Sequence, residues 1–271
     1  TWDELRDVAP VLQRNNLEIG LGDMYTTMLY QLGGTLYNDE QTEILFAEQR
    51  SVEAFRDYTK FYADYDFPLT FSFENRFSSG EMPLGIVNYT TYNRLVYFYP
   101  EIKGQWAMYP LPGTVREDGT VSYVQATGGE QISLVETPAS ATASVIFTKA
   151  RDYDASWAFL RWWGDSATQA RFGNDLEAIM GPSARYATAN REAFRELPWS
   201  AQEKESLGRQ MDELLVLPIL PGNYYVTRGI TNSFRGIVYD RDNVREMLTK
   251  WEGVINEELT RKWAEYRRNN P

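Results

Sequence analysis

The sequence contains neither cysteine nor histidine among its 271 residues. Without cysteine no disulfide can form, and without both residue types a zinc site built from Cys or His ligands is excluded. The same absence excludes catalysis by a Ser-His-Asp triad or by a Cys-His pair. The glycine pair at 128–129 has neither a Walker lysine nor a Rossmann pattern beside it, so no phosphate-binding loop is expected. We therefore predict neither a metal nor an organic cofactor.

Basic residues are few relative to acidic ones, with 27 against 38 and a net charge of −11. A negative field repels phosphate backbones, so nucleic acid is not expected as a partner. Long hydrophobic runs are also missing, because no apolar segment of the sequence reaches the length that spans a bilayer. The charge balance is compatible with a neutral ligand.

Aromatic residues, by contrast, are abundant at 14%, with 18 tyrosines and 8 tryptophans. Hydrophobic residues make up 43% of the chain, which is enough to bury a core, and the length suits two domains. Segments with a helical repeat alternate with short segments that read as strands. This alternation predicts an α/β fold.

Helical spacing of apolar residues and capping residues predict where the helices lie. Thr1 with Glu4, and Ser200 with Glu203, form capping boxes, and Ser51 is expected to cap a further helix. The predicted helices span 1–13, 24–32, 51–65, 154–163, a stretch from 166, 200–215, and a long segment from 242 almost to the end. The predicted strands lie around 83–88, 105–113, 121–124, 131–135 and 144–148.

Most of the tryptophans are expected to pack in the core. Trp157 and Leu160 are predicted to face inward on one helix, and the tandem Trp162–Trp163 on the same helix to pack rather than to stack on a ligand. Trp106 lies in an alternating segment and is predicted to be a core residue. Loop carboxylates, namely Asp23, Glu74 and Glu130, leave a glycosidase open as an alternative, but with 38 acidic residues such loop pairs are expected by chance.

One short stretch, PGNYYVTRGI at 221–230, places two tyrosines and an arginine just after a turn. A buried segment would favour aliphatic residues there. The tyrosine rings offer apolar faces with polar tips, and the arginine offers a planar set of donors. These groups suit a ligand with apolar faces and hydroxyl edges, as sugars and some peptides have.

The order of several segments resembles that of the bacterial extracellular solute-binding proteins of ABC transporters, in the sugar-type family 1 that includes maltose-binding protein. The segments that carry the resemblance are TWDEL (1–5), QLGGTLY (31–37), FSSGEMPLGIVNYTTY (77–92), AMYPLPG (107–113), ASWAFLRWWGDSATQARFG (155–173), LPILPGNYYVTRGITNSFRGIVYD (217–240) and INEELTRK (255–262). The third segment departs from the family pattern at Pro83 and Leu84, where alanine and methionine are usual. Each motif is short, but their shared order extends over nearly the whole chain.

The resemblance implies a type II periplasmic-binding-protein-like fold that lacks most of its N-terminal lobe. Residues 1–131 are expected to build the first part of the C-terminal lobe. Residues 132–195 are expected to belong to the N-terminal lobe, and residues 196–271 to complete the C-terminal lobe with a long terminal helix. The abrupt start on a helix cap fits this expectation of an upstream part.

The resemblance also implies which residues bind the ligand. Two tyrosines are expected to stack on or edge a sugar, an arginine to line the cleft, and a loop near residue 90 to contribute a further aromatic. A second loop, near residue 23, matches the family only loosely. The predicted ligand-binding residues are Tyr224, Tyr225, Arg228, Asn88, Tyr89, Tyr92, Asp23 and Tyr25.

The same resemblance implies that the protein binds a carbohydrate, with an oligosaccharide favoured, that it delivers this ligand to the permease subunits of an ABC importer, and that it is not an enzyme. It would act outside the cell, at the cell surface or in the periplasm, with membrane contact only through a lipid anchor on the upstream part. Two alternatives remain open. One is a glycoside hydrolase or lyase that uses loop carboxylates, and the other is a surface module that attaches to carbohydrate without a transporter.

Overall fold

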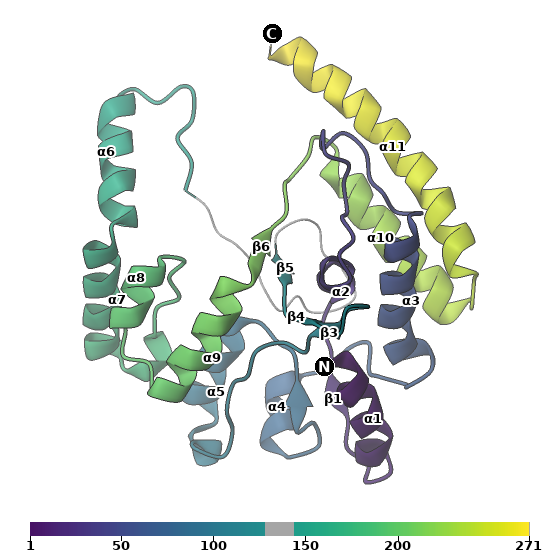
Figure 1. The fold of residues 1–271 in the computed structure, drawn as a ribbon. Helices are drawn as coiled ribbons and strands as arrows, with labels where there is room; N and C mark the ends of the chain where they lie inside the picture. The colour runs from purple at the N-terminus through teal and green to yellow at the C-terminus, as the bar shows by residue number, and fades with distance from the viewer. Residues whose placement is uncertain (128–143, 271) are drawn as a thin grey trace. The chain divides into compact units, whose positions relative to one another are not determined.

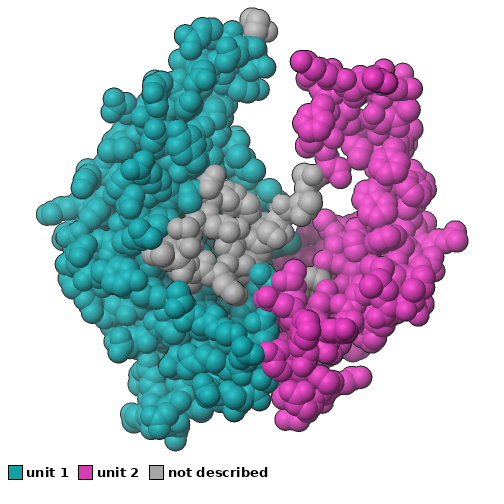
Figure 2. Space-filling model, turned by 180° about the vertical axis from the view of Figure 1, so that it is seen from behind, with its two compact units in different colours: residues 1–88, 111–140, 213–271 teal, residues 89–110, 141–212 magenta. Residues whose placement is uncertain are grey.

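The computed structural model describes residues 1–127 and 144–270. The chain divides into two compact units, which we describe separately (Figure 2). Unit 1 comprises residues 1–88, 111–140 and 213–271, and unit 2 comprises residues 89–110 and 141–212. These bounds differ from the predicted three-part division at 131 and 195, and the assignment of segments to lobes stays a prediction.

Unit 1 is built from six helices and three pairs of short strands among its described residues (Figure 1). The helices are α1 (Trp2–Gln13), α2 (Tyr25–Gln31), α3 (Gln49–Ala63), α4 (Phe73–Ser78), α10 (Asn223–Tyr239) and α11 (Val244–Asn269). The strands are β1 (Ile19–Gly20), β2 (Leu84–Gly85), β3 (Thr114–Val115), β4 (Val121–Ser122), β5 (Gln125–Thr127) and β6 (Leu214–Val216). The mixture of helices and strands confirms the predicted α/β class.

The strands pair two by two. β1 pairs with β2 and β5 with β6 in parallel, whereas β3 and β4 form an antiparallel hairpin. Gly119 lies at the hairpin tip with a φ of 81°, a left-handed conformation that glycine adopts without strain, as the predicted turn requires. The predicted strands at 105–113 and 144–148 are wrong, because neither segment pairs with another strand. The predicted strand at 131–135 lies outside the described residues.

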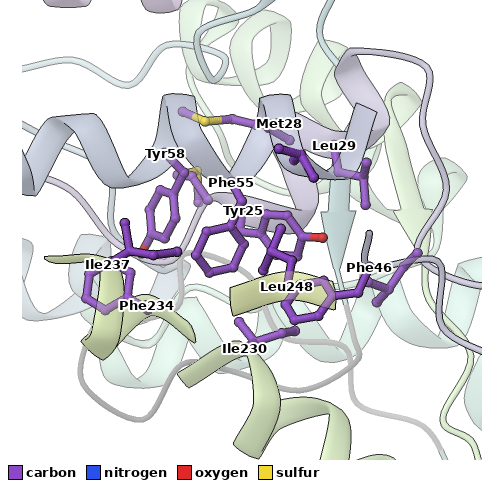
Figure 3. Close-up of a cluster of buried hydrophobic side chains, with 14 of the residues drawn as sticks. Tyr25, Met28, Leu29, Phe46, Phe55, Tyr58, Ile230, Phe234, Ile237 and Leu248 are labelled. Carbon is purple, nitrogen blue, oxygen red and sulfur yellow. The ribbon is translucent and has the colours of Figure 1, made fainter. Parts of the chain in front are cut away.

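The core of unit 1 is an aromatic cluster between α2, α3, α10 and α11 (Figure 3). The rings of Tyr25 and Phe55 lie 4.7 Å apart, and those of Tyr58 and Phe234 lie 5.5 Å apart. Such tilted contacts add to the free energy gained by removing the rings from water. Ser51 does not cap α3 as predicted, because the helix already begins at Gln49 and the Ser51 hydroxyl lies buried, 2.6 Å from that of Tyr25.

Gln31, at the end of α2, joins three parts of unit 1 through its fully buried amide. Its Oε1 accepts hydrogen bonds from Trp2 Nε1 at 2.6 Å and from Thr114 Oγ1 at 2.8 Å. Its Nε2 donates to the carbonyls of Pro112 and Val124, both at 3.0 Å. Because the buried amide is satisfied by these four hydrogen bonds, this side chain fixes α1 and the β3–β4 hairpin against α2.

The predicted long terminal helix is confirmed as α11, which has 26 residues. Leu248, Ile255 and Leu259 of its predicted apolar stripe are fully buried. The helix packs closely on α10, since a Cβ at Gly229 of α10 would lie 2.4 Å from Ile255 Cδ1. No helix among the described residues combines the length and the apolarity that crossing a bilayer requires.

Unit 2 is helical in its described residues. Its elements are α5 (Tyr89–Phe98), the short 3₁₀ helices η1 (Pro100–Ile102) and η2 (Pro182–Ala184), α6 (Tyr153–Gly164), α7 (Ser166–Met180), α8 (Arg191–Glu196) and α9 (Ala201–Asp212). Its core contains Tyr92, Phe194, Leu197 and Trp199. Both predicted capping boxes are confirmed, at Thr1 for α1 and at Ser200 for α9.

Two of the three tryptophans of α6 do not pack as predicted. Trp157 is 53% and Trp162 is 56% exposed, and α6 has no buried residue. Trp163 is half-buried beside Phe172, with ring centroids 5.1 Å apart. Helical spacing shows which residues share a face, but it does not show whether another element covers that face. Trp106 is half-buried and packs on the unit 2 core, although it lies in no strand.

Candidate functional site

The first turn of α10 presents the predicted tyrosine pair, and two features fix its position. Gly222 precedes the helix with a φ of 88°, where an L side chain is strained. A Cβ at this residue would also lie 3.0 Å from Lys262 Cγ of α11, which is closer than nearly all such contacts. Only glycine therefore brings the start of α10 this close to α11.

Asn223, the first residue of α10, anchors the turn from the interior. Its Oδ1 accepts a hydrogen bond from the Tyr37 hydroxyl at 2.8 Å and a longer one from the Leu220 amide at 3.5 Å. Asn223 is buried, whereas the next residue, Tyr224, is 53% exposed. The backbone is thus held by buried bonds while the tyrosine ring stays accessible.

Tyr224 and Tyr225, which we call the α10 aromatic pair, pack on each other with ring centroids 4.3 Å apart and planes tilted by 38°. Arg228 follows Tyr224 by four residues, so that it lies on the same face of the helix, and it is exposed. The pKa of Tyr225 is raised, first by its hydrogen bond with Tyr224, then by partial burial and by the negative charge of Glu258 on α11. The pair therefore combines two aromatic faces with hydroxyl, guanidinium and carboxylate groups.

The residues predicted from the loop before α2 occupy a different environment. Tyr25 is fully buried in the core, with its hydroxyl against Ser51, and burial raises its pKa strongly. This burial is at odds with the ligand contact predicted for Tyr25. Asp23 is half-buried and accepts a hydrogen bond from the Tyr25 amide at 3.2 Å. The carboxylate also helps to raise the pKa of Tyr62, after burial of that ring.

The remaining predicted residues surround the start of α5. Asn88 is half-buried and directly precedes the helix, and Tyr89 is the first residue of α5, with its side chain outside the described part. Tyr92 is buried in unit 2. The structure thus brings Tyr224 and Tyr225 together near Arg228 in unit 1, and it places Tyr92 in a pocket of unit 2.

The unit 2 pocket has a volume of about 530 Å³, a size typical of small-molecule sites. Aromatic rings form much of its wall, from Tyr92, Trp106 and Trp199. Arg185 and Glu203 supply charged groups. We call this cavity the α5–α9 pocket, since α5 and α9 contribute to its wall.

A network of charged hydrogen bonds holds the wall of the pocket together. Arg185 donates to both carboxylate oxygens of Glu177, from Nη2 at 2.7 Å and from Nε at 2.9 Å. Arg185 Nη1 donates to the Tyr92 hydroxyl at 2.7 Å, and that hydroxyl donates to Glu203 Oε1 at 3.0 Å. The guanidinium lies 4.7 Å from the centre of the Trp199 ring, within the range of a cation–π contact. These bonds hold the wall residues in one arrangement.

The network shifts the pKa of its members. Burial raises the pKa of Tyr92 well above its usual range. Burial alone would also raise the pKa of Glu203, but hydrogen bonds from Ser200 and Tyr92 and the charge of Arg185 outweigh it and lower the pKa. The pKa of Arg185 is raised, mainly by the hydrogen bond to Glu177. Glu203 therefore stays ionised at neutral pH.

Sequence reasoning found Tyr92 but missed the partners that complete the pocket. Glu203 was predicted only as a helix cap, and Arg185 lies 93 residues from Tyr92. No local pattern links residues so far apart. The capping box with Ser200 indicated the local role of Glu203, but it gave no sign of the contacts with Tyr92 and Arg185.

Solved structures of sugar-binding proteins share this fold. A sugar-binding protein, MalE, from Xanthomonas citri superposes with a TM-score of 0.70 at 17% identity, covering 98% of this chain and 65% of that one. An ABC transporter solute-binding protein from Thermotoga lettingae, bound to α-D-tagatose, superposes with a TM-score of 0.61 at 15% identity, covering 96% and 64%. A Listeria monocytogenes ABC substrate-binding protein in complex with cycloalternan gives 0.56 at 14% identity, covering 95% and 63%.

No family model matches the sequence, and the search of curated proteins finds no match either. The structural likeness confirms the predicted type II periplasmic-binding-protein-like fold, and with it the resemblance to the sugar-type solute-binding proteins at the level of the fold. The chain spans slightly less than two thirds of the length of these proteins.

Proposed function

We propose that this chain binds a carbohydrate, preferentially an oligosaccharide, as the solute-binding component of an ABC importer. The observation that carries the proposal is the α10 aromatic pair. Its two rings pack on each other, the buried Asn223 next to it is held by Tyr37, and the Tyr224 ring is exposed. Aromatic faces bury the CH surface of a sugar ring, and the polar groups around them bond its hydroxyls. The shared fold with sugar-binding proteins supports the same ligand class.

Each residue of the proposed site has a distinct role. Tyr224 offers the more exposed ring and stacks on a sugar face. Tyr225 supports that ring from one side and contributes its hydroxyl. Arg228, on the same face of α10, donates hydrogen bonds to sugar hydroxyls through its planar guanidinium. Asp23 and Asn88 of unit 1 and Tyr89 and Tyr92 of unit 2 remain proposed ligand-binding residues, but we give them no role at the α10 aromatic pair. We leave out Tyr25 because it is fully buried in the core.

The proposed partners and location follow from the importer role. Permease subunits of the transporter are the proposed protein partner, and the proposed location is outside the cell or in the periplasm, with a lipid anchor on an upstream part. A carbohydrate-attachment module would bind sugar through the same residues but would have no permease partner. The fold shared with ABC solute-binding proteins favours the importer role.

Binding without hydrolysis fits the electrostatics better than a glycosidase does. A glycosidase needs a carboxylic acid with a raised pKa beside a second carboxylate. Glu203 of the α5–α9 pocket and Glu177 behind its wall both form ion pairs with Arg185, but the pKa of Glu203 is lowered. A carboxylate of this kind accepts hydrogen bonds and does not donate a proton near neutral pH. Glu130, the third loop carboxylate considered, lies outside the described residues.

Ligand-observed saturation-transfer NMR tests the proposal, since it detects even millimolar binding. We expect signals from at least one of α-D-tagatose, maltose, maltotetraose and cycloalternan, and we expect Tyr224→Ala to weaken binding about tenfold, as loss of a stacked aromatic does at a binding hot spot. Tyr239→Ala is the matched control, because Tyr239 lies at the other end of α10 and is 58% exposed. Equal losses in both variants would contradict the proposed site, as would an unchanged affinity in Tyr224→Ala.

A further inference from the structure

The α5–α9 pocket is a concave site whose lining residues all belong to unit 2, whereas the α10 aromatic pair belongs to unit 1. The ring of Trp106 in its wall is half-buried, whereas those of Tyr92 and Trp199 are almost fully buried. Trp106 packs edge-on against Tyr92, with centroids 5.5 Å apart and planes at 74°. One tryptophan face is thus held in a fixed orientation at the pocket wall.

Polar groups complete the wall beside this ring. The Glu203 side chain is 23% exposed, and Gln202 and Ser200 next to it are exposed as well. The Tyr92 hydroxyl, the Ser200 amide and Arg185 hold the Glu203 carboxylate in place. A carboxylate fixed in this way can accept further hydrogen bonds, and an amide side chain both donates and accepts.

The charges around the pocket balance. Lys103 and Arg185 line the cavity with Glu203, and Glu177 pairs with Arg185 through two hydrogen bonds. Two cations and two anions therefore lie in the pocket wall or directly behind it, so the site favours a neutral polar ligand over a strongly charged one. An aromatic face beside fixed hydrogen-bonding groups, without net charge, is suited to an uncharged sugar.

We infer that the α5–α9 pocket is a second carbohydrate-binding site, in which a neutral sugar ring stacks on Trp106 and donates hydroxyl hydrogens to Glu203. Gln202 contributes a further hydrogen bond at the rim. Arg185 is a positioning residue, because its hydrogen bonds to Tyr92 and Glu203 hold these two side chains in place. The inference rests on the proposed function only for the class of ligand, since Trp106, Glu203 and Gln202 do not belong to the site at the α10 aromatic pair.

A two-dimensional NMR titration that follows the tryptophan indole N–H groups tests this site directly. We expect maltotetraose to shift the Trp106 indole signal in a saturable way, also in the Tyr224→Ala variant. Trp106→Ala in that background is expected to weaken the remaining binding about tenfold or more. Trp157→Ala is the matched control in unit 2, because Trp157 is exposed on α6 and lines no part of the pocket.

The outcomes separate the two sites. Loss of all binding in Tyr224→Ala, with no shift of the Trp106 signal, would overturn the second site and leave the proposed function intact. Binding that survives Tyr224→Ala and is lost in Trp106→Ala supports the second site. Gln202→Ala is a second test that does not depend on a core residue, because Gln202 is exposed at the rim and makes no bond in the Arg185 network. It is expected to weaken the binding that remains in Tyr224→Ala. Absence of binding in the unsubstituted protein would overturn both.

Discussion

At the scale of single residues, the Glu203 side chain stabilises its own helix and also connects that helix to another one. Its Oε2 accepts a hydrogen bond from the Ser200 amide at 2.8 Å and so caps α9. Its Oε1 accepts one from the Tyr92 hydroxyl, on α5. The carboxylate therefore ties the start of α9 to α5, and both interactions are stronger for the ionised form.

The lowered pKa of Glu203 predicts a pH-dependent contribution to stability. A carboxyl group whose pKa is lower in the folded state stabilises the fold above its unfolded value of 4.5, and this stabilisation is lost as the pH falls through the folded value. We expect Glu203→Gln to lower the free energy of unfolding at about pH 7 and to have a smaller effect at about pH 3. Urea unfolding at the two pH values measures the difference.

Glu205→Gln is the control for this prediction, because Glu205 is exposed on the same helix. It is expected to change the free energy of unfolding less than Glu203→Gln does. A Glu203→Gln effect of the same size at both pH values would contradict the assigned role of the carboxylate charge.

At the scale of elements, the placement of the α10 aromatic pair depends on the glycine before the helix. Gly222→Ala forces a side chain into a left-handed conformation, with its Cβ against Lys262. We expect a loss of about 1 kcal/mol or more in the free energy of unfolding. Gly253→Ala on α11 is the opposite control, since nothing lies within 4 Å of its added Cβ, and it should stabilise the helix by up to about 1 kcal/mol. Thermal unfolding of both variants checks the two signs, and destabilisation of equal size in both would contradict this account.

Elements stabilised by their own sequence were predictable, and those stabilised by distant partners were not. The capped helices α1 and α9 and the striped helix α11 followed from local spacing. The strands are only two or three residues long, and β5 pairs with β6 almost ninety residues later, so that no local pattern specifies them. The exposed tryptophans of α6 show the same limit, because a helical stripe does not identify what covers it.

The candidate sites divide in the same way. Tyr224, Tyr225 and Arg228 lie within five residues, so one short stretch of sequence revealed them. The burial of Tyr25 is at odds with its predicted ligand contact, because the position of a tyrosine at the start of a helix, next to a loop, does not show that its ring turns into the core. The α5–α9 pocket joins Tyr92 to residues around 185 and 203, and only the folded chain brings these together.

At the scale of the whole molecule, unit 1 is assembled from segments far apart in the chain. Its core forms only when α10 and α11, from residues 223–269, pack on α2 and α3 from the first sixty-three residues (Figures 1 and 3). The α10 aromatic pair lies on the helix that closes this core. Binding at the pair therefore depends on the complete fold of unit 1 and not on the short segment alone.

An amide NMR titration of the ¹⁵N-labelled protein with maltotetraose and cycloalternan tests directly whether sugar binds at the α10 aromatic pair. We expect saturable shifts of the amides in the first turn of α10, between Asn223 and Arg228. We expect no saturable shift at the exposed far end of the same helix, near Tyr239. Amide signals of the first turn that stay unchanged, at sugar concentrations that saturate any other part of the protein or reach the solubility limit, would contradict binding at the pair.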